Sequence, residues 1–229
     1  MFDCGGLAIG VPLSHKVADG FVIFTFFQAW AAACRFGNTT EVVTCPSFEM
    51  GSLLLARDTD KLKIPVPEEY GVTMVTKRFV FDELAISTLK AKAKAIGEVS
   101  RVVVMTAVLW KARILVVQAK HGLLWPSLLN ISYNLQRKTD CLKTEDADDL
   151  FTLMISSMTE IHEILEKNET DICVFTSVCG FPYYEVDFGW GKPSWVNSVH
   201  KPSDIVLMMD TECGRGIEAW ETLEKKRTC

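Results

Sequence analysis

Two titratable residues, His15 and Asp19, stand four positions apart in the sequence, and Gly20 follows at once. They lie between an apolar stretch that favours a strand, Leu7–Val11, and an apolar stretch that favours a helix. A histidine at such a junction can project into a cleft and act as a general base, while a nearby carboxylate holds the ring or the local backbone. The alternative is structural, with Asp19 as the N-cap of the helix and His15 as an ordinary loop histidine. The spacing alone leaves both interpretations open.

A second pattern, Asp187-Phe188-Gly189-Trp190-Gly191, begins with the D-F-G that binds magnesium in protein kinases. The sequence has no G-x-G-x-x-G loop, no H-R-D and no V-A-I-K strand, and a kinase site is therefore not expected. Two glycines around a tryptophan favour a tight turn that an aromatic side chain anchors. We expect a structural role for this turn.

The other candidate residues carry less information. His162 lacks the second histidine of H-E-x-x-H, and His121 and His200 stand in turn-like sequence. Lys90 and Lys94 share one helical face, which suits either a phosphate group or plain solvent. The sequence contains no G-x-S-x-G elbow and no CxxC pair, and no metal site is expected.

The composition is that of an ordinary globular protein, with 48% hydrophobic and 23% charged residues among 229. This length fits one large domain or two small ones. The net charge of −5 and the lack of a basic cluster argue against nucleic acid as a partner. The eight cysteines and a start unlike a signal peptide favour a cytoplasmic chain with free, mostly buried thiols. The most apolar stretch, residues 21–34, is too short to cross a bilayer, and we expect no membrane partner.

The order of the predicted elements favours an α/β or α+β fold with some antiparallel strands, because helices and strands do not alternate strictly. Asp82 and Ser100 are candidate N-caps, and Gly37, Gly97 and Gly122 are candidate helix ends. The patterns predict helices over residues 19–35, 82–96, 101–120 and from about 144 to 165, the third deeply buried, and strands over 7–11, 76–81, 128–135, 171–178, 205–209 and 216–223.

Several short motifs gain meaning when they are taken together. They are Phe2-Asp3-Cys4-Gly5-Gly6, Ser14-His15-Lys16-Val17-Ala18-Asp19-Gly20, Ser100-Arg101, Thr106-Ala107, Trp110-Lys111, Asn134-Leu135, Phe175-Thr176-Ser177, Phe181-Pro182, Asp187-Phe188-Gly189-Trp190-Gly191-Lys192-Pro193, Asp210-Thr211 and Gly216-Ile217-Glu218-Ala219-Trp220. In this order they resemble the plant BAHD acyl-CoA-dependent acyltransferases, in particular the vinorine-synthase-like branch. The resemblance covers nearly the whole chain.

This resemblance implies a two-domain fold like that of chloramphenicol acetyltransferase, with mixed sheets and a channel between the domains. By the same resemblance the chain transfers an acyl group from a CoA thioester to a hydroxyl or amine of a plant specialised metabolite, with His15 as the general base. Asp19 supports the loop of His15 by pairing with an arginine, and Ser100, Arg101 and Thr176 are candidates to bind the acyl-CoA. The D-F-G-W-G turn lies away from the chemistry. Acyl-CoA is then a co-substrate, and no cofactor is bound permanently.

The resemblance also implies a division of the chain. The expected parts are 1–47, a remnant of the N-terminal domain with the H-x-x-x-D pair; 48–74, a crossover linker; 75–186, the C-terminal domain; 187–208, a return to the N-terminal domain; and 209–229, the end of the C-terminal domain.

Four departures from the family pattern stand out. Family members carry a long segment before the F-x-C-G-G strand, so we expect the N-terminal domain to be largely missing here, and the segment after Leu135 is short. Gln136 stands where the arginine expected to pair with Asp19 belongs, and Val178 stands where the family usually has tryptophan. Such losses expose apolar surface on the helix over residues 21–30, which favours self-association in a family of monomers. The alternative function is therefore a truncated, non-catalytic pseudoenzyme or interaction module.

Overall fold

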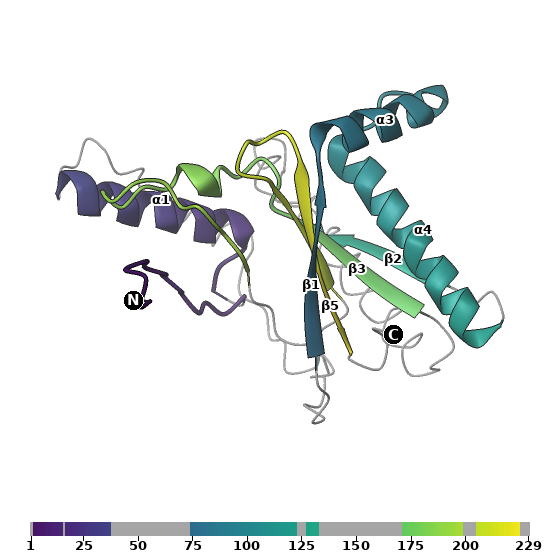
Figure 1. The fold of residues 1–229 in the computed structure, drawn as a ribbon, viewed down its shortest axis with the longest axis horizontal. Helices are drawn as coiled ribbons and strands as arrows, with labels where there is room; N and C mark the ends of the chain where they lie inside the picture. The colour runs from purple at the N-terminus through teal and green to yellow at the C-terminus, as the bar shows by residue number, and fades with distance from the viewer. Residues whose placement is uncertain are drawn as a thin grey trace, which may run out of the picture.

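The computed structural model describes residues 2–15, 17–37, 74–122, 127–132, 171–198 and 205–224. Its elements are α1 (Gly20–Phe36), β1 (Met74–Phe81), α3 (Glu83–Ala93), the 3-10 turn η1 (Lys94–Ile96), α4 (Arg101–His121), β2 (Ser127–Ser132), β3 (Asp171–Ser177), the 3-10 turn η3 (Tyr183–Glu185), β4 (Ile205–Asp210) and β5 (Ile217–Glu224). The strands form one five-stranded sheet in the order β1-β5-β4-β3-β2, with α3 and α4 to one side of it and α1 well to the other (Figure 1). β5 is antiparallel to both β1 and β4, whereas β4, β3 and β2 are parallel. The sheet is therefore mixed.

The main core lies between the sheet and the pair α3 and α4. Successive side chains of a strand point to opposite faces, so every second residue of β3, β4 and β5 reaches this core. Each of its members is at most 2% exposed, and they are Ile86, Met105, Cys173, Phe175, Val206, Met208, Ile217 and Ala219.

The opposite face of the sheet holds a second, smaller cluster. Strand register aligns Thr176, Leu207, Trp220 and Arg78 across β3, β4, β5 and β1. Leu207 and Trp220 are buried there together with Met209. This face lies towards α1 and carries residues from four strands.

The helix ends follow the capping rules that the sequence indicates. The side chains of Asp19, Asp82 and Ser100 each accept a hydrogen bond from the backbone N–H three residues further on, at 2.8, 2.7 and 3.2 Å. Gly122 adopts the left-handed conformation with φ of 70°, which favours glycine. The predicted starts of all three helices are thus confirmed.

Two sequence predictions are wrong. Residues 7–11 form no strand and are mostly exposed, because no described strand pairs with them. The helix over residues 101–120 is not deeply buried, since only Val104, Met105, Thr106 and Arg113 of α4 are buried. Its apolar residues on the far side face away from the one sheet that it covers.

The helix predicted from about 144 to 165 and the end of the strand predicted at 133–135 lie outside the described residues.

The five cysteines that the structure describes differ in exposure. Cys4, Cys34 and Cys213 are exposed free thiols, whereas Cys173 is buried and Cys179 is half-buried. That most of the eight thiols are buried stays a prediction, because Cys45, Cys141 and Cys229 lie outside the described residues.

Within the described part of the chain, α4 alone has the length and composition to cross a membrane. Its inner face carries Val104 and Met105 against the sheet, and the side chain of Arg113 is 8% exposed, with its guanidinium 3.8 Å from the Glu221 carboxylate of β5. These contacts are those of a helix that covers a sheet. That the chain has no membrane partner stays a prediction.

Candidate functional site

His15 lies in a tight turn that leads directly into α1. The backbone N–H groups of Val17 and Ala18 donate to the carbonyl of Ser14, at 2.9 and 3.3 Å, and so bend the chain around His15. The imidazole is exposed. The turn therefore presents the ring to solvent at the N-terminal end of a helix.

Asp19 fixes the end of this turn. Its carboxylate oxygen accepts the N–H of Val22 at 2.8 Å, which makes Asp19 the N-cap of α1. The predicted N-cap is thereby confirmed, whereas the pairing of Asp19 with an arginine stays a prediction, since Gln136, where the family would supply that arginine, lies outside the described residues. Burial and, to a smaller extent, the Asp19 carboxylate raise the pKa of the Tyr183 phenol to about 12.

The start of α1 is fastened to the segment that follows β3. The Tyr183 hydroxyl donates to the Gly20 carbonyl at 3.1 Å. A Cβ added at Gly20 would lie 3.4 Å from Val178, so the helix approaches this segment closely. Val178 in turn donates its N–H to Met208 of β4 at 2.9 Å. The turn that carries His15 is thus held at the end of β3, two residues beyond Thr176.

The other end of α1 is held by the D-F-G-W-G turn. The Asp187 carboxylate accepts the N–H groups of Gly189 at 2.7 Å and Gly191 at 3.0 Å. Both glycines have positive φ, 102° and 104°, which other residues rarely adopt. The Arg35 guanidinium of α1 lies 3.6 Å from Asp187. These backbone N–H groups, and more weakly Arg35, hold the pKa of the Asp187 carboxyl below its usual value.

An aromatic contact strengthens the same connection. The Phe188 ring meets Trp30 of α1 edge to face, with 5.0 Å between centroids. Arg35 stands sixteen residues after Asp19, which at about 1.5 Å per helical residue puts this turn roughly 24 Å from the start of the helix. The turn supports α1 at a distance from His15.

Asp187→Asn is expected to remove an acid-dependent part of the stability. Because folding lowers the pKa of Asp187, its contribution is complete above the unfolded pKa of about 4 and is lost as pH falls through the folded value. Asparagine keeps an oxygen acceptor for the two N–H groups but carries no charge. The difference in unfolding midpoint between wild type and variant should therefore be constant from about pH 7 to pH 5 and shrink below about pH 4. Thermal unfolding at each pH measures it, with exposed Asp3→Asn as the control, and a difference that does not change with pH would contradict the prediction.

The three candidate CoA-binding residues have distinct surroundings. Ser100 caps α4, and the Arg101 guanidinium donates to Asp210 at 3.0 Å and to two carbonyls of the β4–β5 turn. Asp210 also accepts the N–H of Gly180 at 2.7 Å. Asp210 thus connects α4 to the segment after β3, a role that the sequence did not reveal. Thr176 is half-buried in β3, on the face opposite α4. These contacts are structural, and binding of CoA by the three residues stays a prediction.

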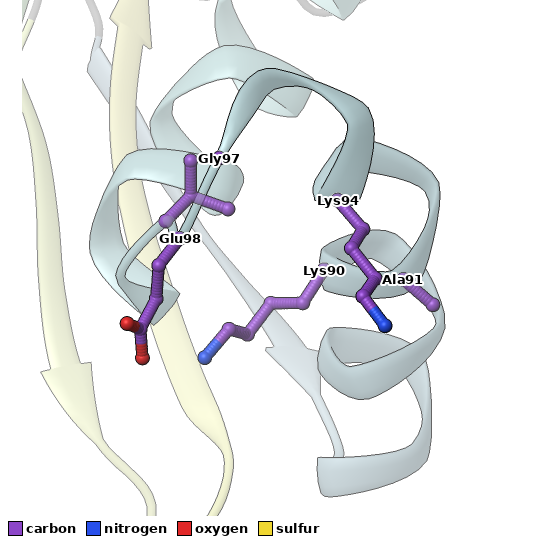
Figure 2. Close-up of a pocket in the computed structure, with 6 residues that line it drawn as sticks. Lys90, Ala91, Lys94, Gly97 and Glu98 are labelled. Atoms are coloured by element: carbon purple, nitrogen blue, oxygen red, sulfur yellow. The ribbon is translucent and has the colours of Figure 1, made fainter.

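A pocket of about 520 Å³ lies where α3 and η1 turn towards α4. Figure 2 shows the Lys90 side chain extending towards the Glu98 carboxylate, whereas the Lys94 side chain extends on the other side of Lys90, next to Ala91. Val99 also lines the pocket, directly before Ser100. The lining thus carries two ammonium groups and one carboxylate, and this balance of charge favours an anionic ligand.

Comparison with known proteins identifies the family. The family model described as "Transferase family" matches residues 1–141 and 128–228. Vinorine synthase of Rauvolfia serpentina is 35% identical over 96% of this chain, and stemmadenine O-acetyltransferase of Catharanthus roseus is 33% identical over 96%. Acetyl-CoA-benzylalcohol acetyltransferase of Clarkia breweri is 31% identical over 95%. The chain belongs to this transferase family, the BAHD acyltransferases.

The solved structures confirm the predicted fold class. The crystal structure of vinorine synthase has a TM-score of 0.72 and 30% identity, and the match covers 94% of this chain and 58% of that one. F. graminearum TRI101 complexed with coenzyme A and deoxynivalenol has a TM-score of 0.60 at 14% identity, covering 90% and 61%. The chain spans 59% of the length of vinorine synthase in the sequence comparison.

Proposed function

We propose that this chain takes part in acyl transfer from a CoA thioester to a hydroxyl or amine of a plant specialised metabolite, in the cytoplasm. The observation that carries the proposal is the exposed His15, placed on a capped turn that is fastened to the end of β3. Stemmadenine O-acetyltransferase and acetyl-CoA-benzylalcohol acetyltransferase support this substrate class by their names. Acyl-CoA is a co-substrate and not a resident cofactor, and a solved relative of the same fold holds coenzyme A.

The chemistry needs one base and no covalent enzyme intermediate. The neutral His15 imidazole takes the proton of the acceptor hydroxyl as its oxygen attacks the thioester carbonyl. The tetrahedral intermediate then collapses, the carbon–sulfur bond breaks, and the CoA thiolate takes up the proton from the imidazolium. Asp19 contributes by fixing the turn, since its carboxylate is bonded to the N–H of Val22.

The pocket formed by the end of α3, η1 and the residues that lead into α4 supplies a candidate site for the phosphate groups of CoA. Lys90 and Lys94 both line the pocket, and since their side chains extend in different directions, each can contact a different phosphate group of CoA (Figure 2). The pocket ends at Val99, directly before Ser100 and Arg101. We assign the two lysines to the phosphate groups as part of this proposal.

Coenzyme A is expected to raise the midpoint of thermal unfolding of the purified chain. Binding to the native state alone adds RT ln(1 + [L]/Kd) to the free energy of unfolding, about 2.7 kcal/mol at a ligand concentration of 100 Kd. The Lys90→Gln/Lys94→Gln variant should lose most of the shift, whereas Lys111→Gln, an exposed lysine on α4, should keep it.

Either of two results would count against the proposal. If coenzyme A leaves the midpoint unchanged, the chain does not bind it and the proposed function fails. If the shift persists in Lys90→Gln/Lys94→Gln, CoA binds elsewhere and the assignment of the lysines is wrong.

A further inference from the structure

Tyr183 makes two separate contacts with α1, one with its ring and one with its hydroxyl. The ring meets Phe24 edge to face, with 5.1 Å between centroids, and so joins the apolar cluster between α1 and the segment after β3. The hydroxyl reaches the first residue of the helix and donates to the Gly20 carbonyl at 3.1 Å. Removing the hydroxyl alone therefore separates the two contacts.

The hydroxyl contact differs in kind from the apolar contacts around it. Phe21 meets Phe181 edge to face, with 5.8 Å between centroids, and a Cβ added at Gly20 would lie 3.7 Å from the Phe181 ring. Such contacts press the helix against the segment, but they are not directional and restrict its rotation and sliding less. A hydrogen bond requires a short distance and a favourable angle, so it fixes one atom of the helix. Among the described residues, it is the one polar contact between the first turn of α1 and another element.

The backbone that carries Tyr183 is itself fixed. Its N–H donates to the Phe181 carbonyl at 2.7 Å, and its carbonyl accepts the N–H of Val186 at 3.2 Å, at the end of the 3-10 turn η3. This turn lies beside α1 (Figure 1). The rings of Phe24 and Phe181 restrain the phenol from two sides, at 5.1 and 6.3 Å between centroids. A hydroxyl on a restrained ring can define the position of the atom to which it donates.

A short stretch of hydrogen-bonded chain connects Gly20 to His15. Asp19 precedes Gly20 and caps the helix through the N–H of Val22, at 2.8 Å. Before it, the Ser14 carbonyl accepts two N–H groups of the turn, at 2.9 and 3.3 Å. A shift of the Gly20 carbonyl therefore moves the turn with it and changes the direction of the imidazole.

We propose that Tyr183 is a positioning residue for His15, whose hydroxyl fixes the start of α1 and thereby the direction in which the imidazole points. The proposal rests on the proposed function, in which His15 is the base. A general base works only within hydrogen-bond reach of the proton that it takes, and a small displacement lowers the rate. Burial raises the pKa of the Tyr183 phenol to about 12, so the hydroxyl keeps its proton and its bond to Gly20 at neutral pH.

Tyr183→Phe removes the hydroxyl and keeps the ring. We expect kcat for acyl transfer to fall about tenfold, because the base is less well aligned, while KM for acetyl-CoA changes less than about twofold. The pH midpoint of kcat should stay the same, since the base itself is unchanged. Release of the CoA thiol from acetyl-CoA, with benzyl alcohol as acceptor, measures these quantities.

Tyr184→Phe is the matched control, because it makes the same change at the next residue. The Tyr184 side chain is buried, and its hydroxyl accepts the backbone N–H of Val196. Both variants lose a hydroxyl that is engaged in a hydrogen bond, so both should unfold at a slightly lower temperature. Only Tyr183→Phe should lower kcat, and a loss of stability alone then cannot explain the difference.

Hydrogen exchange tests the same contact without any substrate. The amides of Val17 and Ala18 are bonded within the turn, and the amide of Val22 is bonded to the cap. These three amides should exchange at least about fivefold faster in Tyr183→Phe than in Tyr184→Phe, because the turn opens more often once the helix start is released.

Three results would overturn the proposal. Equal exchange in the two variants would mean that the hydroxyl does not fix the turn. Equal kcat in the two variants would mean that the base does not depend on this bond, and a change confined to KM would place Tyr183 in substrate binding. If the wild type shows no turnover, the proposed function fails instead, and the exchange rates alone decide whether the hydroxyl fixes the turn of His15.

Discussion

His15→Ala is expected to lower the rate of acyl transfer by about 10²- to 10⁴-fold, the usual contribution of a positioned general base. The acceptor hydroxyl is too weak a nucleophile while it keeps its proton, and alanine offers no atom to accept it. The unfolding midpoint should stay within the small range typical of exposed residues, since the imidazole lies at the surface of its turn. Loss of rate with an unchanged midpoint separates a chemical role from a structural one.

Release of the CoA thiol from acetyl-CoA, with benzyl alcohol as acceptor, measures this rate. His121→Ala is the matched control, because His121 is an exposed histidine at the far end of α4. A wild-type rate in His15→Ala would mean that another group is the base. Absence of turnover in the wild type despite CoA binding would instead favour the non-catalytic alternative.

Arg78→Met is expected to destabilise the fold by about 2 kcal/mol, because it removes two charge-assisted hydrogen bonds from the buried Glu218 carboxylate, although the Arg78 side chain itself is 40% exposed. The Glu218 side chain is 2% exposed, and its two oxygens accept from the Arg78 guanidinium at 2.6 and 2.8 Å. The guanidinium carbon also lies 5.7 Å from the Trp220 ring, a contact that methionine can partly replace. The expected loss therefore comes mainly from the charge.

Denaturant unfolding of a double-mutant cycle measures this interaction. Arg78→Met/Glu218→Leu should regain most of the stability, because no buried charge remains. Lys192→Met breaks the exposed pair with Glu185, whose side chains are 61% and 57% exposed, and should cost less than about 1 kcal/mol. If Arg78→Met costs no more than Lys192→Met, the pair of Arg78 and Glu218 does not stabilise the sheet.

The sequence predicted those features of the fold that depend only on residues close together in the chain, such as the helix caps. Asp19, Asp82 and Ser100 stand directly before apolar runs, and each caps a helix where the pattern indicated. The strand at residues 7–11 was wrong because a strand requires a partner, which an alternating pattern does not contain. The burial of α4 was overestimated for a similar reason. The apolar composition of a helix does not show on how many of its sides other elements pack.

The candidate site was predictable in its residues and not in its connections. The spacing of His15 and Asp19 indicated a strand-to-helix junction with a candidate base. The bond from Tyr183 to Gly20 joins residues 163 positions apart, and the pair Arg78 and Glu218 joins residues 140 apart. Both depend on strand register and chain path, which no local pattern encodes.

The segment from Tyr183 to Asp187 holds α1 at two points, Gly20 and Arg35, and this sets a requirement on its length. A helix held at one point can swing about that point, whereas a helix held at two cannot. Removing one residue from 184–186 would shorten the segment by up to about 3.3 Å, and both attachments could no longer be kept. The direction in which α1 holds the turn of His15 therefore depends on the length of this short segment.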